Sequence, residues 1–486
     1  MLPYKSLLSI DKNLKMPVYQ QITNQIITLI RKGTLKSGQR FLSSRALSEV
    51  LGVHRKTVIV ALDELLAQGW LETKQGSGTF VANNLPEIKP QKLKENDSFL
   101  PKRAGFKFEN QPFLQREVVK ASDKLHLDDG FPDPRLAPLL DLARAYRSNL
   151  IHGNSYVKLG YGYTKGSAWL RQELAVYLNE SRGLKITSDN ILIVRGTMMA
   201  MYLTTLAFIK KDDNVVLGET TWSSAKINFQ QAGANILTIP SDENGILVDV
   251  LEGICKKQTI RLIYITPHHD YPKTITLKAD RRIKLLNLAQ KYRFIVFEDD
   301  YDYDFHYQSK PLLPLASADE AGVVIYSGSF TKSISPAFRV GYLVAPEDII
   351  EHLSHYRRII DRQGDLILEN AFAELLQEGI IQKHLRKSLR EYRERRDVFC
   401  ELLKQNFSNE LNFQIPEGGM SVWTKFDARI NLVKTAENAL KNGLYFSNGL
   451  QHNLPNININ STRLGFASST VDELEKCVEI LKKSLS

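Results

Sequence analysis

Hydrophobic positions in the first 84 residues recur at helical spacing and end in a hairpin pattern. A first helix is predicted by a set of apolar residues that Gly33 closes: Val18, Ile22, Ile26, Leu29 and Ile30. Ser43 and Ser44 can cap a second helix, RALSEVL, and Gly52 allows a tight turn before a third, HRKTVIVALDELLAQ. Two short strands follow, WLETK and TFVA. This order predicts a winged helix-turn-helix over residues 1–84.

A different pattern fills the rest of the chain. Residues 85–125 are dominated by Lys, Glu, Asn, Gln and four prolines, which predicts a linker. From 126 to 486, helical stretches alternate with apolar runs: ILIV, NVVLG, LIYIT, FIVFED and VVIYSG. That alternation predicts a large α/β domain with a mostly parallel sheet and helices on both faces.

Composition narrows the class of protein. No apolar run approaches the roughly 20 residues that cross a bilayer, and the N-terminus lacks the apolar core of a signal peptide. The three cysteines are far apart, which argues against a disulfide scaffold or zinc module and favours the cytoplasm. Residues 1–125 hold 20 Lys and Arg against 11 Asp and Glu, whereas the remainder holds 44 against 43. A basic head indicates a polyanionic partner, although a solvated basic face remains open.

The basic head contains side chains suited to double-stranded DNA. In a helix-turn-helix the third helix enters the major groove by its first turn, here His54 to Thr57. Arg55 can grip guanine bidentately, while the other groups suit phosphates. The predicted DNA-binding residues are Ser43, Ser44, Arg45, His54, Arg55, Lys56, Thr57 and, on the wing, Lys74.

Two segments of the body place polar groups at strand ends. In RGTMMA, Gly196, Thr197 and Met198 open a helix whose N–H groups could bind a phosphate. In FEDDYDYDF, period-2 alternation puts Asp299 on the opposite face from Glu298 and Asp300. A carboxylate there can pair with a pyridine nitrogen. These acidic residues could instead hold a divalent cation, but no patterned histidines lie near them in the sequence, so no metal site is predicted.

A third segment, YSGSFTKSISPAFRVGY, supplies an amine. Lys332 stands among the hydroxyls of Ser329 and Thr331, and Arg339 follows seven residues later. An amine for an aldehyde, with hydroxyls and a guanidinium for a phosphate, suits a Schiff base with pyridoxal 5'-phosphate.

These motifs carry a resemblance to known families. The first segment resembles the GntR-type winged helix, above all in SSRALSEVLGVHRKTV and GSGTFV, with Leu42 in place of the usual proline. The body resembles fold-type-I, class I/II aminotransferases in LDDGFPDPRLAPL, LGYGYTKGSAWLRQELAVYLNESRG, RGTMMA, TPHHDYP, GGMSVW and RLGFA. The two together resemble MocR-type regulators.

The resemblance implies a role for each matching residue. Lys332 would form the internal aldimine, Asp299 would pair with the pyridine nitrogen, and Tyr301 would meet the ring hydroxyl. The other implied contacts are the phosphate ligands Ser329, Arg339 and Thr197, the stacking ring Trp222, the carboxylate-binding Arg463, and Tyr161, which would reach the neighbour's phosphate in a head-to-tail homodimer.

Two functions remain in competition. In the first, a DNA-binding regulator senses an amino acid or amine by external aldimine formation at Lys332. In the second, a catalytically active aminotransferase carries an appended DNA-binding head, because Lys332, Asp299 and Arg463 are all present. The intact basic helix favours the regulator. Departures in HDYPKT, where Asp270, Lys273 and Thr274 replace the usual Gln, Thr and Gly, leave the effector open, as does Ser224, where some relatives carry an effector-binding arginine.

Overall fold

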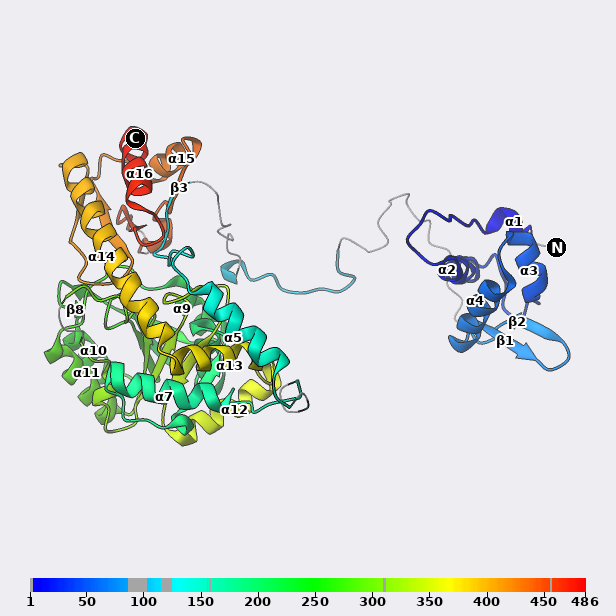
Figure 1. Cartoon of the computed structure of the whole chain (residues 1–486), viewed down its shortest axis with the longest axis horizontal. Helices are drawn as coiled ribbons and strands as arrows, with labels where there is room; N and C mark the ends of the chain where they lie inside the picture. The colour runs from blue at the N-terminus through cyan, green and yellow to red at the C-terminus, as the bar shows by residue number, and fades with distance from the viewer. Residues whose placement is uncertain are drawn as a thin grey trace. The chain divides into compact units, whose positions relative to one another are not determined.

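The computed structural model describes residues 3–85, 103–114, 125–154, 156, 159–308, 312–454 and 457–486. The chain divides into two compact units, Met1–Asn110 and Gln111–Ser486 (Figure 1). Most of the expected linker, residues 86–102 and 115–124, lies outside the described residues. Its last residue, Leu125, already begins a strand of the second unit.

The first unit contains helices and a hairpin in the expected order. They are α1 (Tyr4–Leu7), α2 (Val18–Arg31), α3 (Ser44–Leu51), α4 (Arg55–Ala67), β1 (Leu71–Lys74) and β2 (Gly78–Val81). The Ser43 hydroxyl accepts a hydrogen bond from the Ala46 N–H, and Gly52 ends α3 in the left-handed conformation at φ 62°. β1 and β2 pair antiparallel, with Leu71 opposite Val81. The winged helix-turn-helix prediction is confirmed.

Apolar side chains from the three main helices and from β2 fill the core of this unit. The fully buried ones are Ile22, Ile26, Leu47, Val58, Ala61, Leu65 and Val81. Their helical spacing leaves the first turn of α4 on the surface, where His54, Arg55 and Lys56 are exposed.

A seven-stranded sheet forms the centre of the second unit. Its strands, in spatial order, are β4 (Ile191–Val194), β12 (Gly341–Val344), β11 (Val324–Ser329), β10 (Ile295–Asp300), β9 (Leu262–Ile265), β5 (Asn214–Gly218) and β6 (Asn235–Ile239). Only β12 runs antiparallel to its neighbours, so the mostly parallel sheet is confirmed. All five apolar runs identified in the sequence are strands of this sheet, whereas β6 and β12 were not anticipated.

Helices cover both faces of the sheet. One face packs against α8 (Thr197–Phe208), α9 (Ser223–Gln231) and α12 (Glu347–Ile360). The other packs against α5 (Leu139–Ile151), α7 (Ala168–Arg182), α10 (Val248–Cys255), α11 (Ala279–Tyr292) and α13 (Leu366–Gln377). Alternate residues of one strand enter different cores: in β4, Ile191 and Ile193 face the second set, and Leu192 and Val194 the first.

A long helix, α14 (Ile380–Asn406), leads to a smaller C-terminal region (Figure 1, yellow to red). Here β13 (Leu411–Phe413), β14 (Ser421–Phe426) and β16 (Ser461–Gly465) form an antiparallel sheet, flanked by α15 (Leu432–Lys441) and α16 (Val471–Ser484). β15 (Leu444–Phe446) pairs in parallel with β3 (Leu125–Leu127). The remaining short elements are η1 (Pro112–Leu114), η2 (Ser188–Asn190), β7 (Ser241–Asp242), β8 (Gly245–Ile246), η3 (Leu315–Ala318) and η4 (Leu450–His452). Among the described helices, none has the length and apolar character to cross a membrane.

Candidate functional site

A cavity of about 200 Å³ lies where the carboxyl ends of β10 and β11 meet the first turn of α8. Ten residues predicted from the sequence line it: Thr197, Met198, Trp222, Asp299, Tyr301, Ser329, Thr331, Lys332, Arg339 and Arg463. Four others that line it were not predicted: Asp129, Phe131, Tyr264 and Tyr271. Segments more than 300 residues apart in the chain therefore converge on one site.

The Lys332 amine is held at the wall of this cavity. Its Nζ donates a hydrogen bond to the carbonyl oxygen of Gly130 at 2.7 Å and lies 4.2 Å from the centre of the Phe131 ring. Burial lowers the pKa of Lys332, although the nearby carboxylate of Asp129 opposes that shift. A lowered pKa increases the fraction of neutral amine, the form that attacks a carbonyl carbon.

Asp299 lies buried at the end of β10 and accepts two hydrogen bonds from hydroxyls. Tyr264 donates to Oδ2 at 2.8 Å, and Thr197 donates to Oδ1 at 3.3 Å. Burial, with a smaller effect from Asp300, raises the pKa of Asp299 to about 7. A buried carboxyl of this kind gains from a cationic partner such as a protonated pyridine nitrogen.

The start of α8 and Arg339 form a cradle for an anion. Gly196 is the N-cap residue of α8 at φ 77°, and a Cβ there would come within 3.0 Å of Arg339 Nη2. Arg339 itself adopts a left-handed backbone at φ 54° and donates from Nη2 to the Arg195 carbonyl at 2.7 Å. Thr197 and Ser329 also line the cavity. N–H groups, hydroxyls and a guanidinium suit a phosphate, so this cavity fits pyridoxal phosphate.

Two aromatic residues complete the walls that the sequence predicted. Trp222 is the N-cap residue of α9 and lines the cavity. The Tyr301 hydroxyl donates to the His269 carbonyl oxygen at 3.0 Å, and burial holds the pKa of Tyr301 well above its usual value. The phenol is therefore a neutral hydrogen-bonding group.

Arg463 is already engaged. Its Nε lies 2.8 Å from Oδ1 of Asp129, its Nη1 donates to the Pro272 carbonyl at 2.9 Å, and its guanidinium lies 4.7 Å from the centre of the Tyr271 ring. The Tyr271 hydroxyl donates to the other oxygen of Asp129 at 2.9 Å. The group expected to bind an effector carboxylate thus binds a carboxylate of the chain itself.

Two predicted residues do not line the cavity. Gly196 contributes through the backbone before Thr197, as described above. Tyr161 is 80% exposed, and its ring lies 4.0 Å from the guanidinium carbon of Arg362. The structure therefore does not bring Tyr161 to the site of its own chain.

Signals for the four missed residues were present but incomplete. Asp129 and Phe131 stand in LDDGFPDPRLAPL, and Tyr271 stands in TPHHDYP. Both motifs supported the resemblance without suggesting a role for a particular residue. Tyr264 is one polar group in the apolar run LIYIT, and it aligns with Phe297 across the β9–β10 pair. Only the order of the strands shows that its hydroxyl reaches Asp299.

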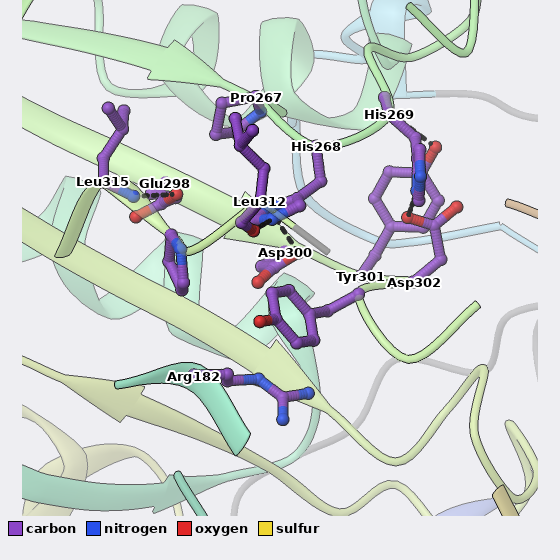
Figure 2. Close-up of polar contacts among 12 residues, drawn as sticks. Arg182, Pro267, His268, His269, Glu298, Asp300, Tyr301, Asp302, Leu312 and Leu315 are labelled. Atoms are coloured by element: carbon purple, nitrogen blue, oxygen red, sulfur yellow. Dashed lines mark hydrogen bonds and ion pairs between the residues drawn. The ribbon is translucent and has the colours of Figure 1, made fainter. Parts of the chain in front are cut away.

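By the alternation along β10, Glu298 and Asp300 lie on the face opposite Asp299, and Figure 2 shows their contacts. Glu298 accepts hydrogen bonds from the backbone N–H groups of Leu315 and Ala316 at 2.8 and 2.9 Å, and burial raises its pKa to about 8. His268 lies 3.4 Å from Asp300, and His269 lies 2.8 Å from Asp302. The sequence shows no patterned histidines beside these carboxylates, yet the fold brings His268 and His269 to them. Even so, the described residues contain no group of three or more side chains placed to hold a metal ion.

The predicted DNA-binding residues gather around the start of α4. The His54 Nδ1 accepts a hydrogen bond from the Lys56 N–H at 3.2 Å, and Arg55 Nε donates to the Ser44 hydroxyl at 3.3 Å. Arg45 at the start of α3 is exposed and forms an ion pair with Glu49 at 3.6 Å. On the wing, Lys74 is also exposed and lies 3.6 Å from Glu72.

Comparison with known proteins gives two family matches. Residues 18–81 match the family described as bacterial regulatory proteins, gntR family, and residues 124–481 match aminotransferase class I and II. The chain is 27% identical to the probable rhizopine catabolism regulatory protein MocR of Rhizobium meliloti, over 86% of this chain and 84% of that protein. It is also 27% identical to the uncharacterized HTH-type transcriptional regulator YisV of Bacillus subtilis, over 95% and 94% of the two chains.

A solved structure resembles the second unit. It is LysN, an alpha-aminoadipate aminotransferase from Thermus thermophilus, complexed with N-(5'-phosphopyridoxyl)-L-leucine. The TM-score is 0.69 at 27% identity, covering 74% of this chain and 92% of LysN.

Proposed function

The chain belongs to the aminotransferase class I and II family and carries a gntR-family head, and from that premise we propose that it is a transcription regulator that senses an amine or amino acid through pyridoxal phosphate held at Lys332. One observation carries the proposal. The same chain presents an exposed basic helix start at Arg55 and a cavity lined by Lys332, Asp299 and Arg339. An enzyme has no need of the first, and an ordinary DNA-binding protein has no need of the second.

Each cavity residue has a role toward the cofactor. When bound, pyridoxal phosphate supplies an aldehyde that condenses with primary amines. Lys332 Nζ would supply the resident amine, Asp299 would hold the proton on the pyridine nitrogen, and the Tyr301 hydroxyl would meet the ring hydroxyl. Thr197, Ser329 and Arg339 bind the phosphate, and Trp222 packs on the ring. The pyridoxyl compound bound by LysN supports this placement.

Sensing exchanges one amine for another. Lys332 Nζ would hold the cofactor through its aldehyde, and an effector amine that took its place there would release Nζ. The released amine would be free to donate to the Gly130 carbonyl, as it does in this structure. DNA binding changes only if the two arrangements of the protein bind the effector with different affinity.

The gntR-family head binds double-stranded DNA, and we place the operator contact at the start of α4. There, exposed His54, Arg55 and Lys56 surround the helix N-terminus. Backbone N–H groups at that end attract phosphate, while the Arg55 guanidinium can read a base edge.

The active form is proposed to be a head-to-tail homodimer. Large apolar side chains of the second unit are exposed on and after α5: Leu139, Leu140, Ile151, Leu159, Tyr161 and Tyr163. Large exposed apolar side chains in one stretch of the chain favour a partner surface, and paired heads suit a two-fold operator. Tyr161 lies outside the cavity of its own chain, which is compatible with a contact to the phosphate in the partner's cavity.

The alternative, a working aminotransferase with a DNA-binding head, also has an observation in its favour. Lys332, Asp299 and Arg463 all line the cavity, so the groups that transamination requires are present. Turnover assays with amino donors and keto acids separate the two functions. Rapid multiple turnover favours the enzyme, while binding without turnover favours the regulator.

The direct test combines spectroscopy with one substitution. Purified protein supplied with pyridoxal phosphate is expected to develop a visible absorbance band that Lys332→Ala lacks. Amines and amino acids screened against that band should include one that shifts it and changes DNA affinity. A wild-type protein that stays colourless with the cofactor contradicts the proposal.

A further inference from the structure

The ion pair between Asp129 and Arg463 bears on which molecules the site accepts. Arg463 is 2% exposed, and its Nε, Nη1 and ring-facing surface are already in contact with Asp129, the Pro272 carbonyl and Tyr271. An incoming α-carboxylate must displace Asp129 or share Arg463 with it. Two carboxylates at one guanidinium repel each other, so the resident carboxylate weakens binding of the second.

Asp129 also faces a second, larger cavity. That cavity has a volume of about 680 Å³ and shares Asp129, Phe131, Trp222 and Tyr271 with the cofactor cavity. The shared walls make it the chamber next to Lys332, since the Phe131 ring lies 4.2 Å from Lys332 Nζ. A molecule in this chamber can therefore present an amine to the cofactor.

The chamber is acidic and aromatic. Its described lining residues include Asp128, Asp129 and Glu437 but no lysine, arginine or histidine. Tyr445 and Phe446 add two further rings to the three shared ones. His452 packs 5.8 Å from the Tyr271 ring, and burial lowers its pKa to about 4, so it adds no positive charge near neutrality. Carboxylates and ring faces both attract alkylammonium groups.

We infer that Asp129 is a specificity-determining residue that selects effectors with a second ammonium group and no free α-carboxylate, such as linear diamines. The inference rests on the proposed function and names its ligand class. One amine of the effector reaches the cofactor near Lys332. The other remains in the chamber, paired with Glu437, because Asp129 is already paired with Arg463.

The surroundings of the acidic residues in the chamber wall agree with these places for the two amines. The side chain of Asp129 is 35% exposed, but its Oδ1 is buried against Arg463 and its Oδ2 accepts from Tyr271, so its charge serves to occupy Arg463. Glu437 is exposed on α15, across the chamber. Asp128 is less available, because its Oδ1 accepts hydrogen bonds from the Gly130 and Phe131 N–H groups and its Oδ2 from Ser468.

Matched pairs of ligands test the inference. The full-length protein with cofactor is titrated with 1,5-diaminopentane and lysine, which differ only by the α-carboxylate, and with butylamine and norvaline, which differ in the same way. The visible band reports binding, and calorimetry on the cofactor-free protein supplies a second readout. We expect 1,5-diaminopentane to bind at least tenfold more tightly than either lysine or butylamine.

Substitutions assign the preference to Asp129. Asp129→Asn should shift the ratio of affinities at least tenfold toward lysine, because it frees Arg463. Glu437→Gln should weaken 1,5-diaminopentane more than butylamine. Asp472→Asn, a change of the same charge at an exposed site on α16 outside both cavities, should alter neither ratio.

The two proposals fail in different ways. If lysine or norvaline binds more tightly than its decarboxylated partner and Asp129→Asn leaves the ratio unchanged, the diamine inference is overturned while the cofactor-based sensor stands. If no amine shifts the band of the loaded protein, the proposed function fails and the inference fails with it.

Discussion

The hydroxyl of Tyr264 donates a hydrogen bond of 2.8 Å to Oδ2 of Asp299, and both side chains are buried at the floor of the cofactor cavity. This contact joins β9 to β10 at the point where the pyridine nitrogen is expected. It stabilises the ionised carboxylate, because the pKa of Asp299 would rise further without it.

Tyr264→Phe tests this contact. A hydrogen bond to a charged group contributes about 1.5–3 kcal/mol, so the affinity for pyridoxal phosphate should fall about 10- to 100-fold. Equilibrium dialysis of the cofactor measures the change. Tyr202→Phe, on the exposed side of α8, is the matched control and should bind normally. Equal affinities of the two variants for pyridoxal phosphate would show that the Tyr264 hydroxyl does not contribute to cofactor binding.

The pH dependence of stability provides a second prediction. The pKa of Asp299 is about 7 in the folded protein against 3.8 normally, so the folded state holds this proton more tightly. The stabilisation is complete below pH 3.8 and is lost as the pH rises through 7. The cofactor-free protein should therefore lose stability between pH 5 and 8, with at most about 3 kcal/mol of that loss from this group, because its contribution ends near pH 7.

Asp299→Asn isolates that contribution. Urea denaturation of the cofactor-free variant, followed by tryptophan fluorescence, should show a smaller decline between pH 5 and 8 than the wild type. The variant should still show some decline, because it keeps three other buried carboxyls with raised pKa values: Glu298, Asp300 and Asp270. Parallel declines in the two proteins would contradict the assigned pKa shift.

Part of this site was predictable from the sequence, for a physical reason. Asp299 and Lys332 each follow an apolar run, and the carboxyl ends of neighbouring parallel strands meet at one edge of a sheet. The strand order could not be read from the chain, because it depends on packing between distant segments. Tyr264 was missed for that reason, and so was the antiparallel β12, which separates β4 from β11.

Asp129 shows a second limit of sequence patterns. Charge alone made it one more acidic residue in LDDGFPDP, yet the fold places it 2.8 Å from Arg463, 334 positions away. The head was more predictable, because its caps and turns are local. Ser43 and Gly52 do in the structure what their residue types indicated.

DNA recognition gives a third prediction. Arg55→Ala removes a guanidinium at the start of α4 and should weaken operator binding by about 1–3 kcal/mol if Arg55 reads a guanine. Fluorescence anisotropy with a genomic operator fragment measures it at a stated salt concentration. Arg429→Ala, which removes an exposed arginine of the second unit, serves as the charge control. An unchanged operator affinity of the Arg55→Ala variant would show that another residue makes the base contact.

The proposed dimer gives a fourth prediction. Leu140 is 88% exposed on α5, so Leu140→Asp should leave the monomer folded while it disfavours an apolar interface. Light scattering is expected to show a dimer for the wild type and a shift toward monomer for this variant. Ile283→Asp on α11, also exposed, should remain dimeric. A wild-type monomer at micromolar concentration would contradict the proposed assembly.

The central claim is that Lys332 carries the cofactor. Borohydride reduction of the cofactor-loaded protein makes the carbon–nitrogen bond permanent, and peptide mass spectrometry then locates it. We expect a phosphopyridoxyl group on Lys332, and its loss when an excess of effector amine is added before reduction. A modified lysine elsewhere, or an unmodified Lys332 peptide in the loaded protein, would contradict the account.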